Sequence, residues 1–227
     1  DALVEVLSPR NFSFVTFIGS WCAPLLNFTT NNIQKAGCVE EVRAAMEQII
    51  HDGNIQTVVL FAEWAHYTHG FRWPDNIASV YQFSETGDFD FSSGKVSENA
   101  EHVQRALVHT LEHLTAAGKT VVMVLPTPEF EFSVPMLLSA LVMRDAAFED
   151  YYMSMDHYHQ RSADVREMLL EAAQTYSATT VDPITVLCDA DTCRLDDGQG
   201  NPLYEDSNHR SFYGALPLAN QIAEALR

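Results

Sequence analysis

The sequence predicts an α/β fold, a three-layer sandwich in which helices flank a central parallel sheet. Two observations lead to this prediction. Short and nearly continuous apolar runs recur along the chain, as expected for strands that are buried on both faces of a parallel sheet. Segments of helical period lie between these runs, and such alternation is typical of one sheet covered by helices. Because the chain shows no internal repeat and no second apolar core, we expect one domain over residues 1–227.

The predicted elements alternate along the chain. The opening stretch DALVEVLSPRNF reads as a helix, and later helices are expected at Cys38–His51, 97–117, 161–176 and 211–226. Gly53 and Gly118 are placed to end the first two of these later helices, and Ser211 is placed to cap the last. The predicted strands are the apolar runs at 13–19, 57–64 and 119–126 and the weaker run at 178–183.

The charge of the chain limits its partners. It carries 13 basic and 31 acidic residues, a net charge of -18, while 47% of its residues are hydrophobic. An acidic surface repels phosphate backbones and anionic lipid headgroups, so we expect no nucleic acid partner and consider neutral sugars better suited. No apolar run approaches the roughly 18 residues needed to cross a bilayer, and the sequence shows no signal peptide.

The four cysteines fall into two local pairs, Cys22 with Cys38 and Cys188 with Cys193. Neither pair has the C-x-x-C spacing of a zinc or redox site. We interpret the pairs as two disulfides formed in an oxidising compartment, with free buried thiols as the alternative. An exported domain without an export signal would be a piece of a longer protein.

Two histidine-containing stretches are explained more simply by helices than by catalysis. HTLEH, from His109 to His113, matches an inverted zinc-protease signature. The apolar stripe of the same helix would turn both histidines toward solvent, where a catalytic zinc finds neither a third ligand nor a cleft, so we expect no metal site. The stripe consists of Val103, Leu107, Leu111 and Leu114. The alternating histidines of DHYHQR, residues 156–161, could line a pocket, but they are more typical of a solvated helix start.

Two long polar loops are predicted at 27–37 and 70–94, and the second is rich in aromatic residues. Loops that follow the strands of an open α/β sheet often carry function. The aromatic side chains would either form a platform for sugar rings or pack the loop onto the body of the domain, and the sequence favours neither.

The stretch YEDSNHRSFYGA, residues 204–215, carries the strongest chemical signal. It places Asp206 three residues ahead of His209, in a turn that leads into the last predicted helix. An aspartate that accepts a hydrogen bond from one imidazole nitrogen leaves the other nitrogen as a general base for a hydroxyl nucleophile. We therefore expect Asp206 and His209 to be the acid and base of a hydrolase or acyltransferase.

At this point the chain resembles a known family. YEDSNHRSFYGA resembles the last block of the SGNH (GDSL-type) hydrolases, and particularly of the SGNH domains fused to membrane-bound acyltransferase family three proteins. Four other stretches are similar to blocks of that family in the same order: GSWCAPL with Cys38 as its partner cysteine, VVLFAEWAHY, LTAAGKTVVMVLPTPEF, and VDPITVLC with Cys193. NPLYEDSNH extends the last block toward the N-terminus.

The resemblance implies an O-acyltransferase, most simply an O-acetyltransferase, of cell-envelope carbohydrate such as lipopolysaccharide or peptidoglycan. A membrane acyltransferase domain in the same parent chain would supply the acyl group, ultimately from acyl-CoA, and this domain would need no cofactor. The domain itself would be periplasmic or otherwise extracytoplasmic, tethered to the membrane through the parent protein.

The resemblance also assigns roles to individual residues. Asp206 and His209 match the family's acid and base, and Asn208 between them is a pocket candidate. Trp64 matches the tryptophan of the third block, but Glu63 precedes it and the oxyanion asparagine of many free SGNH hydrolases is absent there. We therefore expect Glu63 and Trp64 to line the pocket. The oxyanion donors would be backbone amides near Gly19 and Ser20.

The nucleophile does not appear where the family keeps it. The family's serine lies in a Gly-Asp-Ser-His-like block at the end of a first strand, which runs inside the sheet between the second and third strands. We expect that serine upstream of Asp1, with Asp1 near the pocket of His209, and we expect a gap beside the run at 57–64. Ser20 is the alternative nucleophile. A free carbohydrate esterase and a non-catalytic glycan-binding module are the alternative functions.

Overall fold

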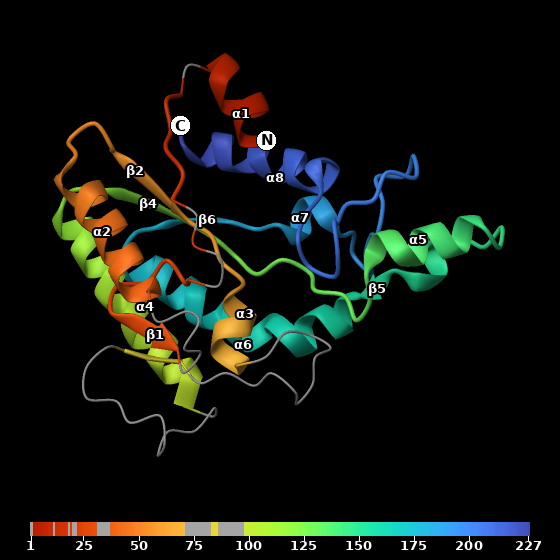
Figure 1. Ribbon diagram of the computed structural model, residues 1–227, viewed down its shortest axis with the longest axis horizontal. Helices are drawn as coiled ribbons and strands as arrows, with labels where there is room; N and C mark the ends of the chain where they lie inside the picture. Colours follow the sequence, from red (N-terminus) through yellow and green to blue (C-terminus); the bar gives the residue numbers. More distant parts are fainter. Residues whose placement is uncertain are drawn as a thin grey trace. The chain divides into compact units, whose positions relative to one another are not determined.

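The computed structural model describes residues 2–10, 12–17, 19, 22–30, 37–70, 83–85 and 98–227. Figure 1 traces the chain in colours that run from red at the N-terminus to blue at the C-terminus. The contacts of the chain divide it into two compact units. Unit 1 consists of Asp1–Val15, Thr127–Ala163 and Val181–Arg227, and unit 2 consists of Thr16–Pro126 and Asp164–Thr180.

A parallel sheet flanked by helices forms the centre of the fold, as the sequence predicts. Its strands are β2 (Thr57–Leu60), β4 (Thr120–Val124) and β6 (Thr179–Val181), in the order β2-β4-β6. Strands β2 and β4 run parallel, with Thr57 opposite Thr120 and Leu60 opposite Met123. In β4 every residue after the first is buried, as a central strand covered on both faces requires.

The helices of unit 2 pack the core around this sheet. They are α2 (Cys38–His51), α3 (Trp64–His69), α4 (Asn99–Ala116) and the later part of α6 (Met155–Thr175). The predicted stripe of α4 is completely buried, whereas His109 is half-buried and His113 is exposed. A short antiparallel pair, β1 (Phe28–Thr30) with β3 (Phe83–Glu85), completes the unit's described strands.

Lys119 is a buried charged residue that ties the end of α2 to the sheet. Its ammonium donates to the carbonyl oxygens of Asp52 and Ile55, at 2.8 and 2.7 Å. Because a cation at a helix C-terminus satisfies carbonyl groups that the helix leaves without partners, this contact compensates the burial of the charge. Gly118, directly before it, has a φ of 73°, a conformation that glycine adopts without strain, and ends α4 as predicted.

The strand predicted at 13–19 is wrong for the residues of that run that the structure describes. Residues 12–17 and residue 19 belong to no strand, and Phe14, Val15 and Phe17 are exposed. The apolar pattern was read as evidence of a strand, but a strand also needs a neighbour for its backbone hydrogen bonds. Among the described residues, β2 pairs with β4 alone and so ends the sheet.

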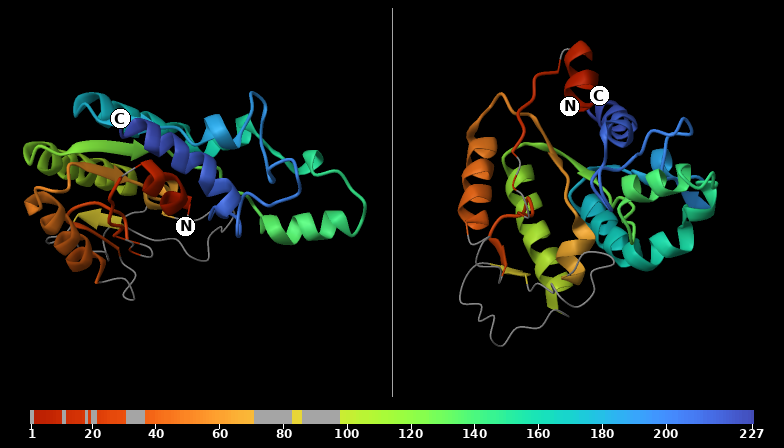
Figure 2. Two further views of the ribbon diagram at one scale, coloured as in Figure 1. Left: turned by 90° about the horizontal axis from the view of Figure 1, so that it is seen from above. Right: turned by 45° about the vertical axis from the view of Figure 1, so that its right-hand side comes forward.

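Unit 1 is mostly helical. Helix α1 (Ala2–Leu7), continued by the 3-10 turn η1 (Ser8–Arg10), lies beside α8 (Phe212–Ala225) in both views of Figure 2. Its other elements are α5 (Val134–Val142), η4 (Glu149–Tyr151), β5 (Met153–Ser154), the start of α6, α7 (Ile184–Leu187) and β7 (Thr192–Cys193).

The N-terminus of α8 is capped as predicted, and its approach to the preceding chain depends on a glycine. The Ser211 hydroxyl accepts hydrogen bonds from the backbone N–H groups of Tyr213 and Gly214. A Cβ atom at Gly214 would lie 2.1 Å from the carbonyl oxygen of Leu203. No larger residue fits there unless the backbone moves, so Gly214 allows α8 to pack directly against the segment that carries Asp206.

Helix boundaries agree with the prediction where caps and apolar periodicity coincide. Helix α2 has the predicted bounds, and α4 and α8 differ from theirs by one or two residues at each end. Helix α6 begins at Met155 and not at 161, so DHYHQR, which was expected to be a solvated helix start, forms its first turns. Helices α3 and α5 are not predicted, because one is short and the other is apolar on most of its surface.

Both predicted disulfides are present, and the described chain has no free cysteine. Cys22–Cys38 joins the entry of α2 to the preceding segment of unit 2, and Cys188–Cys193 closes a small loop between α7 and β7 in unit 1. Within the described part of the chain, no helix has both the length and the apolar character needed to span a bilayer.

We predict that the two disulfides differ in their contribution to stability. Cys22 and Cys38 are 16 residues apart, whereas Cys188 and Cys193 are 5 apart. Because opening the longer loop gives the denatured chain more freedom, Cys22→Ser with Cys38→Ser should cost about 3 kcal/mol, against about 2 kcal/mol for Cys188→Ser with Cys193→Ser. Urea unfolding of the two double variants measures this difference. Four free thiols in the unreduced protein would contradict the pairing itself.

Candidate active site

Asp206 and His209 form a close pair in one turn of unit 1. The Nδ1 atom of His209 lies 2.6 Å from Oδ2 of Asp206. The other carboxylate oxygen, Oδ1, accepts hydrogen bonds from the backbone N–H groups of Asn208 at 2.8 Å and of His209 at 2.7 Å. Both oxygens of Asp206 are thus occupied, and the carboxylate fixes the turn and the imidazole together.

The turn is closed by its own backbone. The N–H of Glu205 donates to the carbonyl oxygen of His209 at 2.7 Å, and Tyr204 and Arg210 form an antiparallel bridge just outside it. The Tyr204 ring is completely buried and meets Phe130 edge to face, with 4.8 Å between ring centroids. The two ends of the turn that contains Asp206 and His209 are therefore held together at one place in unit 1.

The segment that follows β4 holds the turn from outside. The N–H of Phe130 donates to the carbonyl oxygen of Ser207 at 2.7 Å, and the N–H of Val134 donates to that of Asp206 at 3.0 Å. The guanidinium of Arg210 donates to Oγ1 of Thr127 at 2.7 Å and to the carbonyl oxygen of Asn208 at 3.1 Å. Residues 72 to 83 positions earlier in the sequence thus fix the backbone on both sides of His209.

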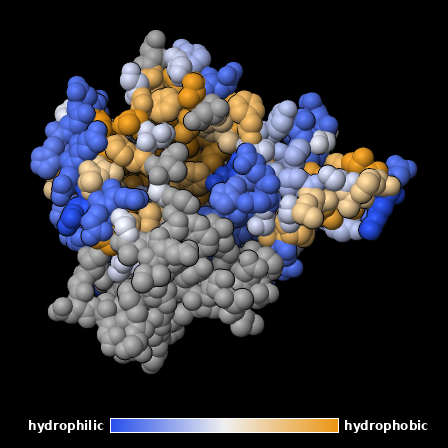
Figure 3. Space-filling model, viewed as in Figure 1, coloured by the Kyte–Doolittle hydropathy of each residue, from blue (hydrophilic) through white to orange (hydrophobic). Residues whose placement is uncertain are grey.

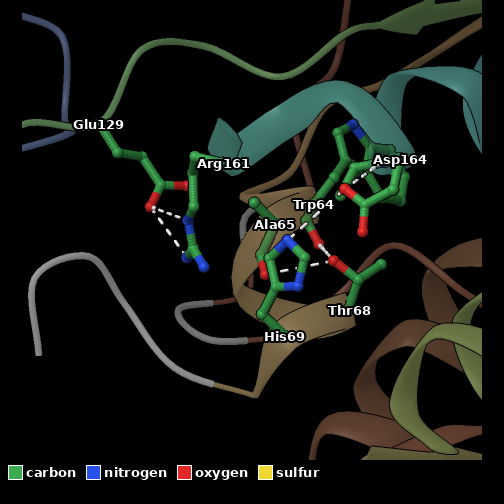
Figure 4. Close-up of polar contacts among 8 residues, drawn as sticks. Trp64, Ala65, Thr68, His69, Glu129, Arg161 and Asp164 are labelled. Carbon is green, nitrogen blue, oxygen red and sulfur yellow. Dashed lines mark hydrogen bonds and ion pairs between the residues drawn. The ribbon is translucent and has the colours of Figure 1, made fainter. Parts of the chain in front are cut away.

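A buried ion pair anchors the same segment. Both Nε and one terminal nitrogen of Arg161 donate to Oε2 of Glu129, at 3.1 and 3.0 Å, and both side chains are buried (Figure 4). Glu129 directly precedes Phe130, whose backbone contacts the turn. Because a buried charge without its partner is costly, the pair ties this part of the segment firmly to α6.

The polar contacts of Asp206 set its charge state. Partial burial alone would raise the pKa of this carboxyl, but hydrogen bonds from the two backbone N–H groups and from His209 outweigh that effect and lower it below the ordinary value of 3.8. Asp206 is therefore ionised at neutral pH. Since a carboxylate only accepts hydrogen bonds, the proton between the two side chains lies on Nδ1 of His209.

The second ring nitrogen of His209 is available for chemistry. The side chains of His209 and Asp206 are 50% and 46% exposed, so reactants can reach the pair. Nε2 of His209 has no hydrogen-bond partner among the described residues, and with the proton on Nδ1 it carries a lone pair. The arrangement can take a proton from a hydroxyl group and return it to a leaving group, which is general acid–base catalysis.

Asn208, the third site candidate of unit 1, lies in the turn with its side chain buried. Its backbone N–H donates a hydrogen bond to the Asp206 carboxylate, and its carbonyl oxygen accepts one from the Arg210 guanidinium. In this structure Asn208 supports the turn through its backbone.

The remaining site candidates belong to unit 2. Trp64 is completely buried at the start of α3, and its indole N–H donates to the carbonyl oxygen of Val124 at 2.8 Å. Glu63 precedes it and accepts the N–H of His66 on its carbonyl oxygen. A Cβ atom at Gly19 would lie 2.7 Å from that of Cys22, so this glycine leaves room for the disulfide. Ser20 lies outside the described residues.

The two histidines of HTLEH contact each other and a neighbouring side chain. His109 and His113 lie with ring centroids 4.2 Å apart on α4, and Asn27 contacts Nε2 of His109. Within the described ranges, no group of three histidine, cysteine or acidic side chains is arranged to hold a metal ion. Most of the aromatic loop at 70–94 lies outside the described residues.

Four contributors to the site are not among the site residues predicted from the sequence: Thr127, Glu129, Arg161 and Arg210. Glu129 and Arg161 are ordinary charged residues in the printed sequence, and their pairing across 32 positions appears only in the folded chain. Arg210 directly follows His209 in the sequence, and this adjacency is the one hint that it would contact the turn.

Comparisons with known proteins agree with this fold. A family model described as "SGNH domain (fused to AT3 domains)" matches residues 1–224. Among solved structures, the chain is similar to the periplasmic domain of a lipopolysaccharide acetyltransferase from Salmonella ser. Paratyphi A. The two share 14% sequence identity with a TM-score of 0.64, over 99% of this chain and 77% of that chain. At this identity the likeness is one of fold. No curated protein sequence matches the chain.

We predict that the contribution of Asp206 to stability depends on pH. Because its folded-state pKa is lowered, the carboxylate stabilises the fold fully above its ordinary pKa of 3.8 and loses that contribution as the pH falls through the lowered value. The unsubstituted protein should therefore have a higher free energy of unfolding than Asp206→Asn. This difference should be largest at neutral pH and should shrink below about pH 4. Chemical denaturation across pH 3–7 measures it. A difference independent of pH would contradict this account.

Proposed function

Because the chain belongs to the SGNH domains that are fused to AT3 domains, we propose that it is the extracytoplasmic domain of an O-acyltransferase that modifies cell-envelope carbohydrate. The acyl group, most simply acetyl, would pass through a serine ester to a hydroxyl of the glycan. The observation that carries the proposal is the 2.6 Å contact of Asp206 with His209, within the block that matches the acid and base of the family.

In the first half-reaction, Nε2 of His209 takes the proton of a serine hydroxyl as the serine oxygen attacks the acyl carbonyl carbon. The Asp206 carboxylate accepts the Nδ1–H and stabilises the imidazolium that forms. When the tetrahedral intermediate collapses, the bond to the donor breaks and Nε2 returns the proton to the departing group. The serine ester and a neutral His209 remain.

In the second half-reaction, a glycan hydroxyl gives its proton to Nε2 of His209 and attacks the carbonyl carbon of the serine ester. Collapse of this intermediate breaks the serine ester bond, and Nε2 protonates the serine oxygen. The products are the acylated glycan and the free serine, so the site is regenerated. His209 must keep one orientation through four proton transfers, and the contacts of Asp206 hold the ring in it.

The nucleophilic serine of this proposal lies upstream of Asp1 in the parent protein. One observation supports that placement. Strand β2 ends the sheet among the described residues, so its outer edge offers a place for a further parallel strand. Such a strand would carry the serine at its carboxyl end.

The same family membership indicates the donor. A membrane acyltransferase domain accompanies SGNH domains of this kind in the parent chain. We propose that it hands over an acyl group taken ultimately from acyl-CoA, and that this domain acts outside the cytoplasm without a cofactor of its own. The two disulfides are consistent with an oxidising compartment. The net charge of -18 suits a neutral glycan acceptor.

Hydrolysis is the second candidate outcome of this chemistry. With His209 half exposed, water can take the place of the glycan hydroxyl in the second half-reaction. The protein would then be a carbohydrate esterase with the same acid, base and serine. The ratio of acylated glycan to free acid produced by the full-length parent distinguishes transfer from hydrolysis.

We predict that His209→Ala in the full-length parent abolishes glycan acylation, and that Asp206→Asn lowers it by about 10³–10⁴-fold, because an amide no longer holds the Nδ1–H tautomer. Mass spectrometry of the extracted glycan measures acylation. His113→Ala, an exposed histidine on α4, is the matched control and should leave acylation unchanged. Acylation that persists in His209→Ala would refute the proposed function.

We further predict that residues 1–227 alone do not form an acyl-serine. A serine-reactive fluorophosphonate should leave the purified chain unmodified and should label a single upstream serine in the full-length parent. Peptide mapping identifies the labelled residue. Labelling of the isolated chain that disappears in Ser20→Ala would show instead that Ser20 is the nucleophile.

A further inference from the structure

Helix α5 presents an apolar face to solvent in a strongly acidic chain. Met136 and Val142 of α5 and Met143, the residue that caps its C-terminus, are 74%, 67% and 82% exposed, and no other large hydrophobic side chain of the described residues is as exposed. Figure 3 shows apolar residues gathered along α5, on the right of the view. The opposite face of α5, formed by Val134, Leu138 and Leu141, is buried in unit 1. Residues 134–142 contain no charged residue, although the chain has 31 acidic ones.

This exposed face is directly connected to the candidate active site. Val134, the first residue of α5, donates its N–H to the carbonyl oxygen of Asp206, and Phe130, four residues earlier, donates to that of Ser207. A molecule bound to the outer face of α5 would therefore lie on the helix whose first turn holds the catalytic turn. Exposed apolar patches of this kind mark interaction surfaces, and methionine adapts its shape to a partner.

We propose that the outer face of α5 is the surface on which the fused membrane acyltransferase domain docks to deliver the acyl group. This inference rests on the proposed function. Residues 134–142 lack charges, and the exposed Arg144 and Asp145 lie just beyond Met143. The uncharged part favours an apolar protein surface, because burying an unpaired charge against it would be costly. The family membership supplies one partner that must meet the site in every catalytic cycle, the membrane domain of the same parent chain.

Two other occupants are less favourable on charge. A second copy of the chain would bring together two molecules that each carry a net charge of -18, and an anionic lipid surface would be repelled in the same way. A membrane domain in the same chain is held close by its covalent linkage, so even a small apolar contact is occupied often. The docking surface proposed here consists of Met136, Val142 and Met143.

The contact can be mapped by photo-cross-linking of the full-length parent in its native membrane. The photoreactive residue p-benzoylphenylalanine replaces Met143 in one sample and Leu170, an exposed apolar residue of α6 in unit 2, in the matched control. We expect position 143, and not position 170, to cross-link to peptides of the membrane domain of the same chain. Cross-links from position 143 to lipid alone or to a second copy, or no cross-link, would overturn the proposal.

Charge substitution tests whether the contact serves acyl transfer. Met136→Glu with Met143→Glu should lower glycan acylation at least about tenfold, because the contact buries two methionine side chains, whereas Met136→Leu with Met143→Leu should stay within about twofold. Leu170→Glu is the control for an added surface charge. Correct disulfide pairing and unchanged protease resistance show that the variants are folded.

The outcomes separate this proposal from the proposed function. Folded Glu variants that acylate glycan at the parental rate, while His209→Ala abolishes acylation, would overturn docking through α5 and leave the catalytic assignment intact. Acylation that survives His209→Ala would overturn both, since the docking proposal assumes that His209 activates the serine that accepts the acyl group. A loss in the Glu variants but not in the Leu variants supports docking.

Discussion

The carboxylate of Asp206 is the group on which the arrangement of the candidate site depends. It accepts three hydrogen bonds, two from the backbone of its own turn and one from the imidazole of His209. The backbone contacts shape the turn, and the same contacts keep the carboxylate ionised, so that it can orient the ring. Local conformation, charge state and chemical competence thus have one physical origin, an anion surrounded by donors.

Long-range contacts then determine where that local unit lies. The segment after β4 holds the turn through two backbone hydrogen bonds and through the contact of Arg210 with Thr127. The buried Glu129–Arg161 pair fixes the segment in turn. Such a pair adds little net stability because both charges lose water, but it restricts the geometry that the segment can adopt. Its contribution is therefore to positional accuracy more than to the free energy of unfolding.

Features encoded within a few residues could be predicted from the sequence, and features that depend on distant partners could not. The Ser211 cap, the end of α4 at Gly118, the stripe of α4 and the Asp206–His209 spacing are all local patterns. The run at 13–19 has a strand's composition but no strand beside it in the described chain, and composition does not reveal a missing neighbour. Arg161 and Glu129 meet through the fold alone.

The placement of Asp206 and His209 in a single turn has a consequence for how the site tolerates change. Many catalytic acid–base pairs are assembled from separate elements, and a small shear between those elements disrupts them. Here the hydrogen bonds that join the pair all lie within residues 206–209, so its internal geometry does not depend on a second element. Motion of the surrounding protein would change which substrate oxygen meets Nε2, but not the readiness of Nε2 to accept a proton. In the proposed mechanism, the same base would therefore serve a donor and an acceptor that arrive from different directions.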